Sequence, residues 1–163
     1  MLQVPLLLGV LLLLGVANGS PVVAAKLLKG RFGAPLDGGR KLGDGRAVFG
    51  SAKTARGLVV SVASTTLAAP ALGFEWGVGI AIAIGAMVGD LTSSFIKRRL
   101  RLEPHAQAFG LDQIPEALLP LLIVRDELGL SWLDVTGLLM AFIALQLGLS
   151  RVLFRLGIRD RPY

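Results

Sequence analysis

The residues best suited to chemistry in this sequence are three carboxylates that lie within or beside apolar stretches. Asp90 ends a long apolar run, and Asp112 opens another, with Glu116 four residues later on the same helical face. A charge inside a membrane-spanning helix costs roughly 2.5–3.5 kcal/mol at mid-depth, so such groups are usually partnered and functional. Because Mg²⁺ prefers carboxylate oxygens, the three predict a magnesium site. The other interpretation is a plain ion pair, for example of Asp90 with Lys97 or Arg98.

A second candidate is the basic, glycine-rich segment 29–57, which holds eight glycines and seven cations. Glycine lets backbone amides approach a ligand closely. Lysine and arginine supply charge and donors for phosphate. The segment therefore suits a polyphosphate ligand. The alternative is a basic loop that only sets membrane topology and contacts anionic lipid headgroups.

The remaining residue types exclude several kinds of catalysis. The sequence has one histidine, His105, which falls in a predicted loop, so neither a histidine-based metal cluster nor a Ser-His-Asp triad is expected. It has no cysteine, which excludes thiol catalysis and disulfides. The stretch from Gly50 to Thr54 is no P-loop, because two residues separate its glycine from Lys53.

The composition is that of a membrane protein. Hydrophobic residues make up 53 % of the chain and charged residues 17 %, against about 25 % charged in soluble domains. The mean hydropathy is +0.69. Disorder is excluded because it needs low hydrophobicity. The net charge of +6 comes from short bursts of cations between apolar runs, a pattern of polytopic membrane proteins. No nucleic-acid partner is expected.

The apolar runs predict an all-α polytopic membrane protein, with residues 1–163 as a single membrane-embedded domain. A membrane helix needs about 20 mainly apolar residues. The segment from Asn18 to Pro21 predicts a kink or break in the first span. A cleaved signal peptide is the alternative for that span, although it lacks a basic n-region. Five spans are expected, near 2–25, 57–73, 76–96, 112–125 and 132–150.

The distribution of positive charge predicts the orientation. Sixteen of the seventeen cations fall in segments 26–56, 97–111 and 151–163, which the positive-inside rule makes cytoplasmic. The N-terminus is then outside and the C-terminus inside. Trp76 and Trp132 fall at outer turns, where an aromatic belt would place them. We expect a multi-pass cell-membrane protein with its active site facing the cytoplasm.

Several short motifs follow one another along most of the chain. In their order and spacing they resemble the CDP-archaeol synthase family, relatives of the CDP-diglyceride synthases. The motifs are Ala17-Asn18-Gly19-Ser20-Pro21, Asp37-Gly38-Gly39, Gly50-x-x-Lys53-Thr54-x-Arg56-Gly57, Gly89-Asp90, Ser94-Phe95-Ile96-Lys97-Arg98-Arg99-Leu100 and Asp112-Gln113-Ile114.

The resemblance implies a five-span membrane cytidylyltransferase. Its partners would be CTP, a lipid phosphate and the bilayer, with pyrophosphate as the second product. It implies catalytic roles for Asp90, Lys97 and Asp112, and Mg²⁺ binding by Asp90, Asp112 and Glu116. It also implies substrate contacts by Asn18, Asp37, Gly38, Gly39, Lys53, Thr54, Arg56, Arg98 and Arg99.

Two positions depart from the family pattern. Ala55 stands where the family usually has an aromatic residue, and Pro115 stands where it usually has a second aspartate. Glu116 follows directly and could replace that aspartate. The alternative function is a non-catalytic small membrane transport or lipid-binding protein. Glycine-rich stretches such as Gly85 to Gly89 permit close helix packing, within one chain or in a homodimer.

Overall fold

The computed structural model describes residues 3–29, 31–102 and 108–155. Among them it holds five helices and no β-strand, with two isolated bridges in the segment that follows the first helix. The all-helical prediction is therefore confirmed. The helices are α1 (Gln3–Leu27), α2 (Ala55–Ala71), α3 (Trp76–Arg99), α4 (Gln113–Val124) and α5 (Trp132–Arg155).

Three of these helices are long and apolar enough to cross a membrane, over Val4–Leu27, Trp76–Arg99 and Trp132–Arg151. α4 has 12 residues. At 1.5 Å per residue it is about 18 Å long, well short of a hydrocarbon core of about 30 Å. The five predicted helices are present, but the one expected near 112–125 is too short to cross a membrane by itself.

The end of α3 corrects the boundary of a predicted loop. The cytoplasmic loop was expected to begin at residue 97, but the helix continues to Arg99. Lys97, Arg98 and Arg99 therefore form its last turn. Cations are favourable there because the carbonyl end of a helix carries a partial negative charge.

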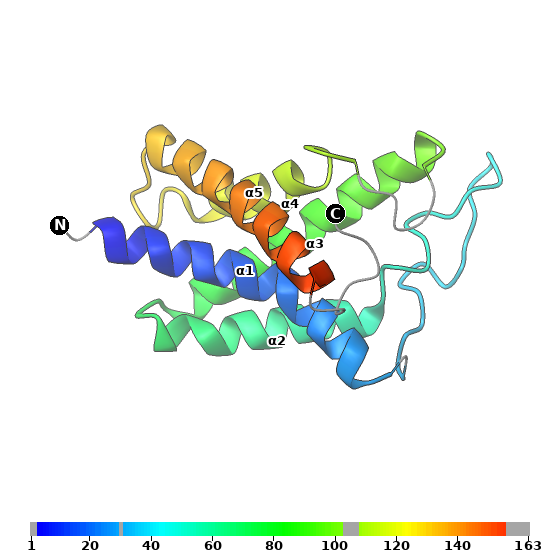
Figure 1. Cartoon of the computed structure of the whole chain (residues 1–163), viewed down its shortest axis with the longest axis horizontal. Helices are drawn as coiled ribbons and strands as arrows, with labels where there is room; N and C mark the ends of the chain where they lie inside the picture. Colours follow the sequence, from blue (N-terminus) through cyan, green and yellow to red (C-terminus); the bar gives the residue numbers. More distant parts are fainter. Residues whose placement is uncertain (1–2, 30, 103–107, 156–163) are drawn as a thin grey trace.

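α1 remains one helix through the segment where a kink or break was expected. Pro21 lies inside it and has no N–H to donate to the carbonyl of Ala17. The hydroxyl of Ser61, on α2, donates to that carbonyl at 2.7 Å. The neighbouring helix thus satisfies the group that proline leaves unpaired. Figure 1 shows α1 bending in this region without breaking.

Figure 1 shows α1 and α2 running side by side, with α5 lying across the α1 side. The segment between α1 and α2 extends beyond the helices, at the end opposite the N-terminus. α4 packs mainly on α3. The core is formed by side chains from all five helices, including Leu14, Ala69, Ile82, Leu121 and Phe142.

Glycines on α3 allow its backbone to touch its neighbours. A Cβ on Gly89 would lie 2.1 Å from the carbonyl oxygen of Pro115, and one on Gly85 would lie 2.7 Å from the Cα of Pro120. A Cβ on Gly79 would lie 2.8 Å from that of Ala69 on α2. These glycines therefore serve packing within the chain. The contact at Gly89 places Asp90, the next residue of α3, beside the first turn of α4.

Candidate active site

A cavity of about 560 Å³ lies among the five helices at the end where the long loop begins. Its polar lining combines residues that are far apart in the sequence. They come from α1 (Asn18), from the loop before α2 (Ser51, Lys53, Thr54), from α2 (Arg56), from α3 (Asp90), from α4 (Glu116) and from α5 (Gln146).

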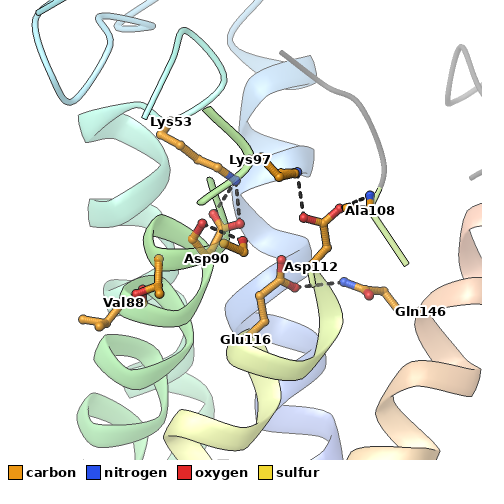
Figure 2. A network of polar contacts seen from close by, with 10 residues as sticks. Lys53, Val88, Asp90, Lys97, Ala108, Asp112, Glu116 and Gln146 are labelled. Carbon is orange, nitrogen blue, oxygen red and sulfur yellow. Dashed lines mark hydrogen bonds and ion pairs between the residues drawn. The ribbon is translucent and has the colours of Figure 1, made fainter. Parts of the chain in front are cut away.

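Lys53 and Asp90 form the central ion pair of this cavity. The Lys53 Nζ lies 2.5 Å from one carboxylate oxygen of Asp90 and 2.6 Å from the other. Both side chains keep about a fifth of their surface exposed, 22 % and 20 %. Figure 2 shows Lys53 reaching down to Asp90 from the loop above α3. An ion pair at Asp90 was one expected alternative, and its partner is Lys53 rather than Lys97 or Arg98.

Glu116 is the second carboxylate of the cavity and is buried, with 7 % of its surface exposed. It lies close enough to Asp90 and Lys53 for strong electrostatic interaction with both. The side-chain amide of Gln146 donates to its Oε2 at 3.0 Å. Two carboxylates from different helices therefore lie near one lysine, and Figure 2 shows Lys53 bonded to Asp90 with Glu116 close by.

Sequence reasoning missed Gln146. The available signal was a lone amide in the otherwise apolar stretch from Leu138 to Leu149. A polar group is expensive in such a stretch unless it finds a partner.

The N-terminus of α2 opens onto the same cavity. Thr54 is the N-cap, and its hydroxyl accepts the backbone N–H of Gly57 at 3.2 Å. Arg56 lines the cavity and donates to the carbonyl of Arg31 at 2.5 Å. A helix N-terminus attracts anions through its unpaired N–H groups and its dipole. Together with Lys53, this end of α2 can hold a phosphate chain.

Asn18 also lines the cavity, from the middle of α1. Its side-chain amide donates to the carbonyl of Leu14 at 3.0 Å. The predicted substrate-binding residues Asn18, Lys53, Thr54 and Arg56 are thus brought together.

Asp37 and its two glycines do not line the cavity. One carboxylate oxygen of Asp37 accepts the N–H of Gly39 at 2.9 Å, and the other accepts those of Phe49 at 2.9 Å and Gly50 at 3.0 Å. Partial burial raises the pKa of this carboxyl, but these backbone donors outweigh it and hold the pKa below its usual value. Gly38 and Gly39 adopt φ of 58° and 74°. The motif therefore stabilises the conformation of the loop through these hydrogen bonds.

Lys97 and Asp112 pair with each other, Nζ to Oδ1 at 2.6 Å. The second oxygen of Asp112 accepts the N–H of Ala108 at 3.1 Å. Neither residue lines the cavity, and Figure 2 places their pair beside the Asp90 and Glu116 group. Within the part of the chain that the structure describes, no three His, Cys, Asp or Glu side chains come together as a metal site. The expected three-carboxylate cluster is thus reduced to a pair.

Arg99 ties the long loop to the end of α3. It donates to the carboxylate of Asp44 at 2.7 Å and to the carbonyl of Ala47 at 2.6 Å. Arg98 is buried, its carbonyl accepts from Arg46 at 3.1 Å, and its guanidinium lies under Gly50. Both were predicted to bind substrate, and neither lines the cavity.

The donor set of the cavity suits a hard divalent cation. Asp90 and Glu116 offer adjacent carboxylate oxygens. Mg²⁺ is commonly held by one or two carboxylates, with water and substrate phosphate completing its octahedral shell. A two-carboxylate site beside a phosphate-binding helix end therefore fits this ion.

Comparisons with known proteins agree with one another. A family model described as CarS-like CDP-archaeol synthase matches residues 71–163. The CDP-archaeol synthase of Sulfolobus acidocaldarius is 38 % identical over 154 residues, which cover 91 % of each chain. That of Saccharolobus islandicus is 32 % identical over 167 residues, covering 97 % of this chain and 96 % of the relative.

A solved structure shares this architecture. It is described as an intramembrane enzyme for archaeal membrane lipid biosynthesis. It superposes with a TM-score of 0.70 at 33 % sequence identity, covering 86 % of this chain and 89 % of the other. The superposition at this identity shows that the two chains share the fold.

Proposed function

The chain belongs to the CDP-archaeol synthase family, and we propose that it is a membrane cytidylyltransferase that transfers CMP from CTP to a lipid phosphate. The observation that carries the proposal is the group of Lys53, Asp90 and Glu116 in a cavity at the N-terminus of α2. We propose that residues 1–163 act as one membrane-embedded domain.

The main task of the site is to bring two polyanions together. Lys53, Arg56 and the N-terminus of α2 lie on one side of the cavity and can contact the triphosphate. Fixed positive groups relieve the repulsion between CTP and the lipid phosphate, and holding both reactants aligned lowers the barrier further. The apolar lining by Val22 and Leu58 suits the lipid side of the acceptor.

Asp90 and Glu116 would hold Mg²⁺ from the carboxylate side of the cavity. The ion would neutralise phosphate charge and polarise the phosphoryl group. Lys53 contacts both oxygens of Asp90. Its ammonium group could leave that carboxylate and bind a phosphate of the substrate. Asp112, held by Lys97, is one helical turn before Glu116. We propose that this pair positions the start of α4.

The chemistry needs no protein base. The second pKa of a phosphate monoester is near 6, so the acceptor is already largely dianionic at neutral pH. Its oxygen attacks the α-phosphorus of CTP, the bond to the β-phosphate breaks, and pyrophosphate leaves. Among the residues that the structure describes, none that lines the cavity is a histidine, and the sequence has no cysteine, which agrees with a reaction that moves no proton from the nucleophile.

The loops and cations suggest which side of the membrane the cavity faces. The long basic segment closes the cavity end of the bundle, and the positive-inside rule places it in the cytoplasm, where CTP is available. We propose an orientation with the N-terminus outside and the C-terminus inside. An arrangement as a homodimer stays a prediction.

The direct test incubates detergent-purified protein with labelled CTP, Mg²⁺ and a panel of lipid phosphates. The panel includes an ether-lipid phosphate and phosphatidate, because the apolar lining of the cavity suits either kind of lipid tail. The expected result is a labelled CDP-lipid with equimolar pyrophosphate. No product with any acceptor, together with no heat of Mg-CTP binding, would overturn the function. Lipid binding without product would favour the non-catalytic alternative.

A further inference from the structure

Gln146 is a polar side chain of α5 that reaches into the active-site cavity. Its Nε2 donates to Oε2 of Glu116 at 3.0 Å. Its Oε1 is buried and finds no hydrogen-bond donor among the residues that the structure describes. Figure 2 shows Gln146 extending from α5 toward Glu116 on α4. This hydrogen bond joins α5 to a carboxylate of the cavity.

The packing of α5 does not require an amide at this position. α5 buries Val135, Leu138 and Phe142 in the shared apolar core, and these side chains account for its attachment. An amide in such a helix costs free energy unless it is paired. Its presence is explained by what it holds, which is a buried carboxylate on another helix.

The hydrogen bond constrains how the Glu116 carboxylate lies. With Oε2 engaged by Gln146, rotation of the carboxylate is restricted at the place where it interacts with Asp90 and Lys53. Partners of this kind orient the ligands of a metal, and their loss typically lowers metal affinity or activity 10–100-fold.

We propose that Gln146 is a positioning residue that fixes Glu116 beside Asp90 and so sets the metal affinity of the carboxylate pair. This inference rests on the proposed function, because it assumes that the pair binds a divalent cation. It adds α5 to the parts of the chain that build the site.

The test compares the wild-type protein with Gln146→Met, which keeps the length of the side chain and removes the amide. Mn²⁺ binding is measured by electron paramagnetic resonance, with and without CTP and without lipid acceptor, so that no turnover occurs. We expect the dissociation constant to rise at least about tenfold. The Mg²⁺ concentration for half-maximal CDP-lipid formation should rise in parallel, while the rate at saturating Mg²⁺ changes much less.

Two further variants keep the result interpretable. Gln146→Asn retains an amide but shortens its reach, so it should also weaken metal binding. Thr136→Val is the matched control, because its exposed hydroxyl on the same helix bonds only to the carbonyl of Trp132. It should bind Mn²⁺ as the wild type does. Thermal unfolding of each variant checks that the fold is retained.

The outcomes separate this inference from the function. Unchanged Mn²⁺ and Mg²⁺ dependence in both Gln146 variants, with an active wild-type protein, would overturn the role of Gln146 alone. A wild-type protein that binds no Mn²⁺ would also overturn it. A wild-type protein that binds the metal but forms no CDP-lipid would instead overturn the proposed reaction.

Discussion

At the scale of single residues, the site depends on how one lysine and two carboxylates share their charges. Lys53 contacts both oxygens of Asp90 and interacts with Glu116. Two neighbouring carboxylates repel each other, the more so because Glu116 is buried, and the positive charge of Lys53 offsets that repulsion. A divalent cation bound between the carboxylates would also offset their repulsion. The three residues therefore suit a site that binds a metal ion and phosphate.

The first prediction concerns Asp90→Asn. This change keeps the shape of the side chain and removes the charge, so Mg²⁺-dependent CDP-lipid formation should fall at least about 100-fold, as when an electrostatic group of an active site is lost. The thermal unfolding midpoint should stay close to the wild-type value. Activity near normal in a folded Asp90→Asn protein would contradict the metal role.

Asp112→Asn is the informative comparison. Asp112 lies outside the cavity and pairs with Lys97, so removing its charge should mainly destabilise the start of α4, by about 1–3 kcal/mol. Activity should fall by about tenfold, as for an outlying partner. Asp126→Asn is the control, since that side chain is 90 % exposed beyond the other end of α4. A loss as complete as that of Asp90→Asn would restore Asp112 to the catalytic group.

At the scale of elements, the contact between α3 and α4 decides whether the carboxylates meet. Gly89 directly precedes Asp90, and Pro115 directly precedes Glu116. The two backbones touch at this point, because a Cβ on Gly89 would overlap the carbonyl of Pro115. Pro115 is also the position where the family pattern has an aspartate. Of the close backbone contacts between α3 and α4, this one lies directly beside the two carboxylates and so places Glu116 next to Asp90.

The second prediction follows from that contact. Gly89→Ala should push α4 away from α3, lowering the free energy of unfolding by about 1–3 kcal/mol and separating Glu116 from Asp90. CDP-lipid formation should fall and the Mg²⁺ requirement should rise. Both are measured in the assay used for the wild-type protein.

Gly77→Ala is the matched control on the same helix. A Cβ at Gly77 would meet nothing within 4 Å. Because alanine loses less backbone entropy than glycine in a helix, this variant should be stabilised by about 0.5–1 kcal/mol and keep its activity. If Gly89→Ala behaves like Gly77→Ala, then the close helix contact is not what places Glu116.

At the scale of the whole molecule, the long basic loop and the cavity lie at the same end of the bundle. The loop is held to the end of α3 by Arg99 and Arg46, and it is folded internally by Asp37. Lys53 at its end enters the cavity. Some of the residues predicted to contact substrate therefore line the cavity, and the others stabilise the loop beside it.

The third prediction tests the orientation. The chain has no cysteine, so single cysteines can be introduced without background. Lys41→Cys lies in the exposed loop and Glu127→Cys lies exposed after α4. In intact cells a membrane-impermeant maleimide should label Glu127→Cys only, because the loop is expected to be cytoplasmic. Labelling of Lys41→Cys should need permeabilisation. The reverse pattern would show that the orientation is inverted.

The sequence by itself determined the helices and the residue types of the site. Runs of apolar residues define helices locally, so the five helices and most of their bounds follow from the sequence, although only three of the helices in the described residues are long and apolar enough to cross a membrane. Charges in apolar surroundings are expensive, and this singled out Asp90, Asp112 and Glu116 without distinguishing which of them meet. The order of the motifs along the sequence also indicated the family, and Lys53, Thr54 and Arg56 belong to one of these motifs.

Only the tertiary structure decided which of these groups meet. Asp90 pairs with Lys53, 37 residues away, and not with the cations of its own helix. Glu116 meets Gln146 across 30 residues, whereas Asp112 is taken by Lys97. Such pairings depend on a folded loop and on backbone contact between helices, and both arise from packing between distant segments. No local pattern of residues encodes them, because a side chain on an apolar helix face can meet whichever partner the packing brings within reach.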